Sequence, residues 1–238
     1  MDYVLSSILG SMQADMDRMD RVAMNLANLQ TPGYKREVAT TAPFAARVQA
    51  GASAVHADPE PGTLKATGQA LDLALSGPGW FEVSTPGGLA YTRQGSLRLD
   101  AAGRLVTQRG FPVMGLGGEI VLTSEAPTID AAGRLFDSGS THRGESAPVA
   151  QLKIVQFARG AAMQRVGDGL LVVRSASALV PDGEVQVRQG FLENSNVSHM
   201  REMVALLEAV RHLETMQKVA LGYDEMLSTS IRKLGDTA

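Results

Sequence analysis

The sequence lacks cysteine altogether across its 238 residues. Disulfide bonds, thiolate metal sites and cysteine nucleophiles are therefore excluded. Aromatic residues are also scarce, at 5% with one tryptophan and four tyrosines, which speaks against a face that stacks on sugars. No run of about 18 apolar residues occurs, so no membrane-spanning helix is expected.

The charge balance excludes another class of partner. With 22 basic and 25 acidic residues the formal net charge is −3, and there is no sign of the clustered basic face that nucleic-acid binding needs. The first twenty residues lack a basic segment, an unbroken apolar stretch and a small-residue cleavage site. They do not resemble a cleaved secretory signal, so export would have to use another route.

What the sequence does have is a heptad pattern at its start. The apolar residues repeat at alternating spacings of four and three, which predicts a long helix that cannot bury its narrow stripe alone. Asp2 is a plausible N-cap, and the Thr-Pro-Gly sequence at 31–33 ends the helix. The predicted seam is Leu5, Leu9, Met12, Met16, Met19, Ala23 and Leu26.

A second heptad pattern at the C-terminal end predicts the partner helix. Gln217 and Asp224 occupy two of its seam positions, and Ser195, Asn196 or Ser198 is the expected N-cap. Pairing of the two terminal helices in a coiled-coil-like layer is therefore expected. The apolar members of this seam are Met203, Leu206, Val210, Leu213, Ala220, Leu227, Ile231 and Leu234.

Between the helices the pattern changes to short alternating runs separated by Gly, Pro and Asp, which predicts antiparallel strands. The expected fold class is α+β. The predicted organisation is a helix in 1–36, an irregular connector in 37–70, a β domain in 71–190 and a helix in 191–238. The β domain is predicted to bury Leu71, Leu73, Leu75, Phe81, Val83, Leu97, Leu99, Leu152 and Ile154.

The segment Asp-Ala-Ala-Gly-Arg-Leu occurs twice, at 100–105 and 130–135. Each copy is interpreted as a hairpin loop with its glycine, Gly103 or Gly133, at a positive φ. Asp100 and Asp130 could be paired carboxylates or calcium ligands. Their first position in matching turns instead favours a turn in which the carboxylate bonds the following backbone.

No catalytic, metal or cofactor site is apparent. The histidines at 56, 142, 199 and 212 lack metal-ligand spacing, and the glycine-rich segments match no phosphate-binding motif. No serine nucleophile motif occurs either. The sequence therefore predicts a protein that is not an enzyme and has no cofactor.

Three long segments resemble the flagellar basal-body rod proteins. These are MNLANLQTPGYKR at 24–36, ALDLALSGPGWFEVSTPGGLAYTRQGSLRLDAAGRLVTQRGFPV at 70–113 and RQGFLENSNVSHMREMVALLEAVRHLETMQK at 188–218. The resemblance implies a structural subunit of the rod in the periplasm, exported by the flagellar type III apparatus without a cleaved signal. It also implies helical polymerisation with copies of itself and other rod proteins, through an inner layer of terminal helices.

Within that family, GPGWFEV and LETMQKV favour the FlgF-type proximal-rod branch over the FlgG-type distal-rod branch. The remaining alternatives are a secreted fibre or adhesin module and, more remotely, a hydrolase. On the resemblance, Tyr34, Lys35 and Arg36 would begin contacts with adjacent subunits. The predicted subunit interface comprises the two seams up to Leu227 together with Asn25, Asn28, Thr31, Pro32, Gly33 and Tyr34.

Overall fold

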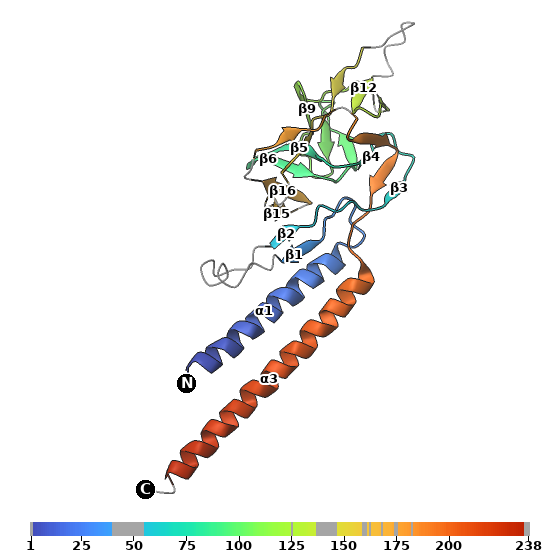
Figure 1. Ribbon diagram of the computed structural model, residues 1–238. Coiled ribbons are helices and arrows are strands. Elements are labelled where there is room, and N and C mark those ends of the chain that lie inside the picture. The colour runs from blue at the N-terminus through green and yellow to red at the C-terminus, as the bar shows by residue number, and fades with distance from the viewer. Residues whose placement is uncertain are drawn as a thin grey trace. The chain divides into compact units, whose positions relative to one another are not determined.

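The computed structural model describes residues 2–39, 55–124, 126–136, 147–158, 161, 163–167, 169–173, 176–181 and 183–235. The chain forms two compact units. The helical unit contains Met1–Ala27 and Ser198–Ala238, and the β unit contains Asn28–Val197. The expected α+β class is confirmed, with terminal helices packed on each other and an antiparallel β region between them in the sequence (Figure 1).

The helical unit is an antiparallel pair of long helices, α1 (Asp2–Ala27) and α3 (His199–Gly235), as Figure 1 shows. Neither helix contains proline, and both carry a heptad pattern, which Gln217 and Asp224 interrupt in α3. The carbonyl of Ser198 accepts the first helical hydrogen bond of α3 from Glu202 N at 3.0 Å. Of the three predicted N-cap residues, Ser198 therefore occupies that position.

The β unit is built from short antiparallel strands. Six of them form its main sheet in the order β15-β16-β6-β5-β14-β17, and the others form sheets of two or three strands. The main-sheet strands are β5 (Trp80–Thr85), β6 (Gly88–Thr92), β14 (Ile154–Gln156), β15 (Met163–Gly167), β16 (Leu170–Val173) and β17 (Ala178–Leu179). The remaining strands are β1 (Glu37–Ala39), β2 (Val55–Ala57), β3 (Leu64–Ala66), β4 (Leu73–Ser76), β7 (Leu97–Leu99), β8 (Leu105–Thr107), β9 (Met114–Gly115), β10 (Gly118–Glu119), β11 (Thr128–Ile129), β12 (Arg134–Phe136), β13 (Ala150–Gln151), β18 (Gln186–Gln189) and β19 (Phe191–Glu193).

The segment 37–70, predicted to be irregular, contributes strands where the structure describes it. β1 pairs with β2, and β3 pairs with β19 near the end of the β unit. Each of these strands spans three residues, which is too short to produce a visible alternation in the sequence.

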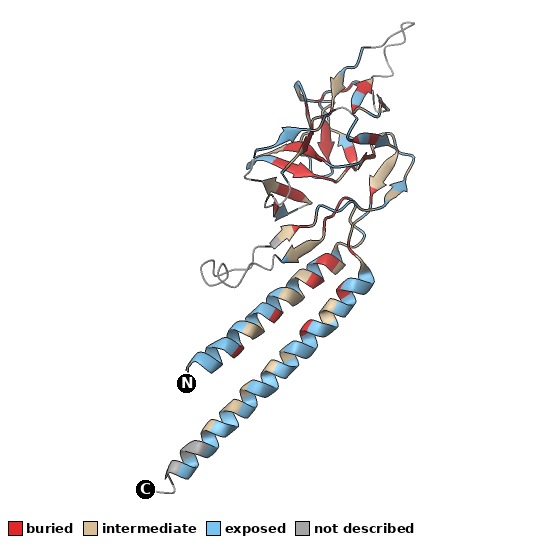
Figure 2. Ribbon diagram, in the orientation of Figure 1, coloured by how far each residue is buried: buried red, intermediate tan, exposed pale blue. Residues whose placement is uncertain are grey.

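The core of the β unit largely follows the predicted pattern (Figure 2). All but two of the residues predicted to be buried are buried, and the exceptions, Leu71 and Leu99, pack against the same cluster half-exposed. A second cluster gathers around Trp80, Tyr91 and Val155. Burial does not alternate along the central strands, because consecutive residues are buried in β4, β5 and β8.

The two Asp-Ala-Ala-Gly-Arg-Leu turns have the same structure. Asp100 Oδ1 accepts hydrogen bonds from the N–H groups two and four residues later at 2.9 and 2.8 Å, and Asp130 does so at 3.0 and 2.9 Å. Gly103 and Gly133 have φ of 75° and 77°. Both turn predictions are confirmed. The hydrogen bonds from the Arg104 backbone hold the pKa of Asp100 below its usual value.

Each turn belongs to a matching unit of three hydrogen-bonded segments. Leu99 pairs with Leu105 in the first copy as Ile129 pairs with Leu135 in the second. A third segment then bonds to the turn glycine, with Leu122 N donating to Gly103 O and Leu152 N to Gly133 O, both at 2.8 Å. The short sequence repeat thus marks a larger structural repeat.

Gly103→Val should lower the stability of the β unit by about 1–3 kcal/mol. A Cβ at this position would meet the carbonyl oxygen of Leu122 at 2.6 Å, on a backbone with positive φ. Denaturant unfolding of the full chain measures the loss. The matched control is Gly117→Val, because Gly117 has open space and no positive φ, and it should change stability by less than about 0.5 kcal/mol. Equal stability of both variants would contradict the turn assignment.

Candidate subunit interface

The face that α1 turns toward α3 is more polar than the heptad pattern suggested. The buried residues among the described part of α1 are Ile8, Asp15, Val22 and Asn25. On α3 they are Glu202 and Ala209. A helix pair that buries so few large apolar side chains gains little stability from its own interface.

Polar contacts cross between the helices. Asn25 Nδ2 donates to Glu202 Oε2 at 3.2 Å, and both residues are 1% exposed. Arg18 forms an exposed ion pair with Glu208 at 2.8 Å, and His212 Nδ1 lies 2.5 Å from Asp15 Oδ2.

The contact between the two helices of one chain therefore contains only about half of the residues of each predicted seam. The residues of the predicted seams that are half-buried recur every seven positions, namely Met12, Met19 and Leu26 on α1 and Leu206, Leu213, Ala220 and Leu227 on α3. At the other predicted seam positions, the residue one position earlier in the sequence is the one that is buried or half-buried. These residues are Ile8, Asp15 and Val22 on α1 and Glu202, Ala209, Met216 and Tyr223 on α3. The side chains of Ile231 and Leu234 lie outside the described residues.

The residues that this displacement leaves out form an outer apolar row. It comprises Leu9, Met16 and Ala23 on α1 and Met203 and Val210 on α3, all exposed. Leu5, which lies in the heptad row of Met12, is exposed as well. Leu9 is 57% exposed and Met16 is 49% exposed. Because the helices are antiparallel and both seams move by one residue in the same direction, helical geometry puts the two rows on the same side of the pair.

The segment after α1 follows a tight path in the β unit. Asn28 O accepts from Thr31 N at 3.1 Å, and Thr31 O accepts from Tyr34 N at 3.2 Å, so two turns follow each other. Gly33 has a φ of 69°, and a Cβ there would lie 2.4 Å from the carbonyl carbon of Arg93. Only glycine fits this close approach.

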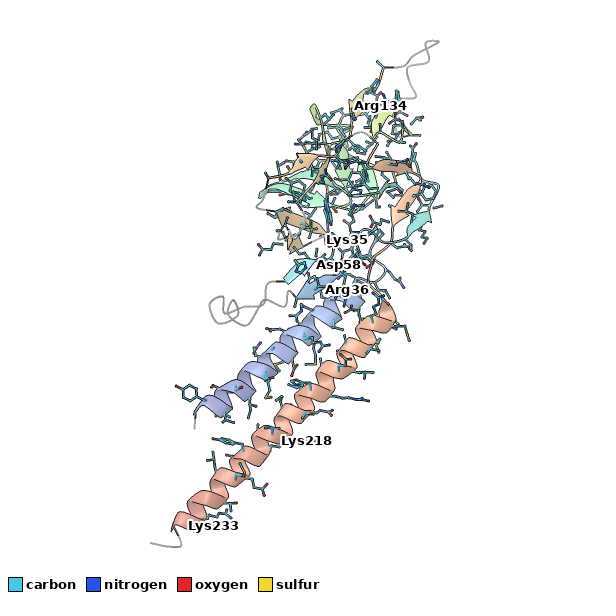
Figure 3. The ribbon with its side chains drawn as sticks, in the orientation of Figure 1. Lys35, Arg36, Asp58, Arg134, Lys218 and Lys233 are labelled. Carbon is cyan, nitrogen blue, oxygen red and sulfur yellow. The ribbon has the colours of Figure 1, made fainter. Side chains whose placement is uncertain are left out.

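Lys35, which follows this segment, belongs to a buried ion cluster. We define the Glu193 cluster as Lys35, Arg93 and Glu193. Lys35 Nζ lies 2.6 Å from Glu193 Oε1, and Arg93 Nη1 lies 3.2 Å from Glu193 Oε2. All three side chains are at most 3% exposed. Figure 3 labels Lys35 within the β unit.

Backbone groups and an aromatic ring complete the surroundings of the cluster. Lys35 Nζ donates to Glu60 O at 2.7 Å, and Arg93 Nη2 donates to Gly77 O at 2.7 Å. Gly62 N donates to Glu193 Oε1 at 2.8 Å. The guanidinium of Arg93 also lies 5.5 Å from the centre of the Trp80 ring, within cation–π range.

One carboxylate thus balances two buried cations. Burial lowers the pKa of Lys35, and the attraction of Glu193 opposes this effect without outweighing it. The pKa of Arg93 is lowered for the same reason. Arg93 Nε is buried without a hydrogen-bond partner among the described residues. The carboxylate of Glu193 therefore offsets the free-energy cost of burying the two cations.

The structure gives Tyr34, Lys35 and Arg36 roles inside their own chain. Tyr34 and Lys35 are each 2% exposed, and the guanidinium of Arg165 lies 4.0 Å from the Tyr34 ring centre. Arg36 N donates to Asn196 Oδ1 at 2.7 Å. Contact of these residues with adjacent subunits stays a prediction, and the side chains of Tyr34 and Lys35 are buried within their own chain. Sequence reasoning missed the partner of Lys35, Glu193, because nothing in a sequence pairs charges 158 positions apart.

The described residues contain no group of three or more potential metal ligands. His142 lies outside them. A pocket of about 110 Å³ beside β14 and β17 is lined mainly by apolar residues and by no titratable side chain. Over the described part of the chain, neither helix has the length and apolar character that a membrane span requires.

The terminal helices pack on each other, and an antiparallel β region lies between them in the sequence. Two known family models match this chain. The model "Flagellar hook protein FlgE/F/G D1 domain" matches residues 74–136, and "Flagellar basal body rod FlgEFG protein C-terminal" matches residues 188–233.

The chain is also similar to known rod proteins over nearly its full length. The chain is 31% identical to the flagellar basal-body rod protein FlgF of Salmonella typhimurium, covering 94% of this chain and 95% of that protein. It is 31% identical to FlgF of Escherichia coli over the same shares, and 29% identical to FlgG of Bacillus subtilis over 94% and 96%. The chain belongs to the flagellar basal-body rod protein family of FlgE, FlgF and FlgG. This family is structural, which confirms the expectation that the protein is not an enzyme.

Glu193→Gln should destabilise the β unit by about 3–5 kcal/mol, because it leaves two buried cations without an anion while preserving the shape of the side chain. Lys35→Met should cost less, because Arg93 and Gly62 N still satisfy the carboxylate. Urea unfolding of both variants measures the difference. A larger loss for Lys35→Met than for Glu193→Gln would contradict the assignment of Glu193 as the essential charge.

Proposed function

We propose that this chain is a FlgF-type subunit of the proximal flagellar rod, which polymerises through its terminal helices to form part of the drive shaft. The observation that carries the proposal is the distribution of side chains on the helix pair. Polar residues lie between the helices, whereas the outer apolar row is exposed. An isolated chain gains nothing from this arrangement, but a chain with neighbours can bury the row.

The proposed interface is the outer apolar row together with the half-buried seam residues that border it. Copies of the same chain and other rod proteins are the proposed partners, as family membership implies. Asn28, Thr31 and Pro32 are half-buried and belong to the proposed interface as flanking residues. Gly33 and Tyr34 are buried by their own chain, so any part they play there would be indirect.

The FlgF assignment is supported by GPGWFEV and LETMQKV and by the two FlgF relatives at 31% identity. FlgG is the second candidate, because FlgG relatives reach 29% and 31% identity, so identity alone does not favour either branch. Location in the periplasmic part of the rod and export by the flagellar type III apparatus are proposed from the family resemblance.

Electron microscopy of the purified protein at high concentration distinguishes the FlgF-type branch from the FlgG-type branch. A FlgF-type subunit is expected to need neighbouring rod proteins, so electron microscopy should show no long rods. Long rods formed by this chain alone would favour the FlgG-type distal rod. Deletion of the gene should in addition leave basal bodies with a missing or truncated rod, and intact motile flagella would refute both branches.

Met16→Asp should prevent incorporation into rods and leave the melting of the isolated chain unchanged. Met16 is exposed in the chain but would be buried on assembly, where an unpaired carboxylate costs several kcal/mol. The matched control is Ala14→Asp, which adds the same charge on the opposite flank of the seam. Motility and basal-body imaging measure the effect. Normal swimming of the Met16→Asp strain would show that the outer apolar row is not part of the interface.

A further inference from the structure

The helix pair has two lateral sides that differ in chemistry. Successive residues of an α-helix are about 100° apart, so the heptad positions assign each exposed residue to one lateral side or to the back of its helix. We call the side that carries the outer apolar row the apolar side. Leu207 and Leu221 of α3 extend this side, and they are 54% and 71% exposed.

The charged residues of the two sides have opposite signs. In the part of the helices that the structure describes, the charged side chains of the apolar side are carboxylates, namely Asp20, Glu214 and Asp224. The charged residues of the opposite side are Arg18, Arg21, Arg201, Glu208 and Lys233. Because Glu208 already pairs with Arg18 of its own chain at 2.8 Å, positive charge is in excess there, and we call it the basic side.

The basic side can also cover apolar side chains. Val4 of α1 and Val219 of α3 lie on it, and each is 48% exposed. Other charged residues, among them Asp17 of α1 and Arg211 and Lys218 of α3, lie on the backs of the helices and belong to neither side. The basic side therefore combines apolar contact with a charge opposite to that of the apolar side.

Like sides of two helix pairs do not fit one another. Two apolar sides in contact would bring their carboxylates together, and two basic sides would do the same with their arginines, which is unfavourable in both cases. An apolar side against a basic side joins opposite charges. Such a contact uses different surfaces of identical chains, so it repeats from copy to copy and does not close as a symmetric dimer.

We propose that the basic side is the second half of the self-association interface, and that the apolar side of one copy packs on the basic side of the next copy. The inference rests on the proposed function, because it concerns the helix pair in the assembled rod. Asp20 and Arg21 are its central charge pair. They are adjacent in the sequence, so they stand at almost the same height on α1, yet they face opposite sides. Copies that lie side by side at a similar height bring Asp20 of one to Arg21 of the next.

Cross-linking tests this contact directly, because the chain has no cysteine of its own. Asp20→Cys and Arg21→Cys are produced in the same cells, and the isolated basal bodies are treated with a short bismaleimide. We expect a product of twice the mass of the chain, and at least about tenfold less of it with either variant alone, because a head-to-tail contact needs both surfaces. Dimers formed by Asp20→Cys alone would show that like sides meet and would overturn the proposal.

Two further outcomes separate this proposal from the proposed function. Basal bodies that contain both cysteine variants without the cross-linked product would overturn the proposal and leave the rod assignment standing. Absence of the unmodified chain from basal bodies would contradict the rod assignment itself.

Charge reversal supplies a second measurement. Asp20→Arg places a cation against Arg21 of the next copy, and Arg21→Asp places a carboxylate against Asp20, so each should lower the amount of the chain in basal bodies at least about fivefold. The double variant restores opposite charges and should return that amount to within about twofold of the unmodified chain. A double variant that assembles no better than the single ones would overturn the proposal.

The matched control is Asp17→Arg, which makes the same change of charge on the back of α1 and should leave incorporation within about twofold. Ala14→Asp also stays compatible with the contact, because Arg18 lies four residues further along the same helix and can pair with the new carboxylate. Equal losses for Asp17→Arg and Asp20→Arg would show that charge on α1 acts without regard to side, which would overturn the proposal.

Discussion

The carboxylate of Glu193 is the constraint on which the rest of the structure depends. It is the anion that neutralises two buried cations, and its backbone carbonyl accepts a hydrogen bond from Gly33. These contacts bring together the end of the N-terminal segment and the start of the C-terminal one. The break after α1 then has a physical explanation, because Gly33 must approach the backbone of Arg93 and Lys35 must reach Glu193.

The helix pair separates two kinds of surface that the sequence presents together. Polar residues such as Asp15, Asn25 and Glu202 pack inside the chain, where specific partners satisfy them. Such contacts select register more than they add stability. The apolar residues beside them remain exposed. Under the proposed function this division would serve assembly, because a chain that buried its whole apolar stripe internally would leave little for a neighbour to bind.

The sequence was sufficient wherever the determining interactions are local. The heptad patterns predicted both helices, and the alternating runs predicted most of the core residues. The repeated turns were predicted from the positions of residues such as Asp100 and Gly103. Interactions between distant positions were less accessible. Two adjacent helix faces are both compatible with Met12, Met19 and Leu26. Hydrophobicity favours Met16 as their companion, whereas the structure buries Asp15 there. The partner of Lys35 likewise depends on the tertiary fold. The three-residue strands in 37–70 carry too few positions to show a period.

The central claim is that the outer apolar row is exposed in the single chain and covered in the rod. Because the chain has no cysteine, Met16→Cys would introduce the one thiol of the protein. Its rate of reaction with a maleimide can be compared between monomer and isolated basal bodies. The account predicts rapid labelling in the monomer and strong protection in the rod, with assembly preserved because cysteine remains apolar. Equal labelling in both states would contradict it.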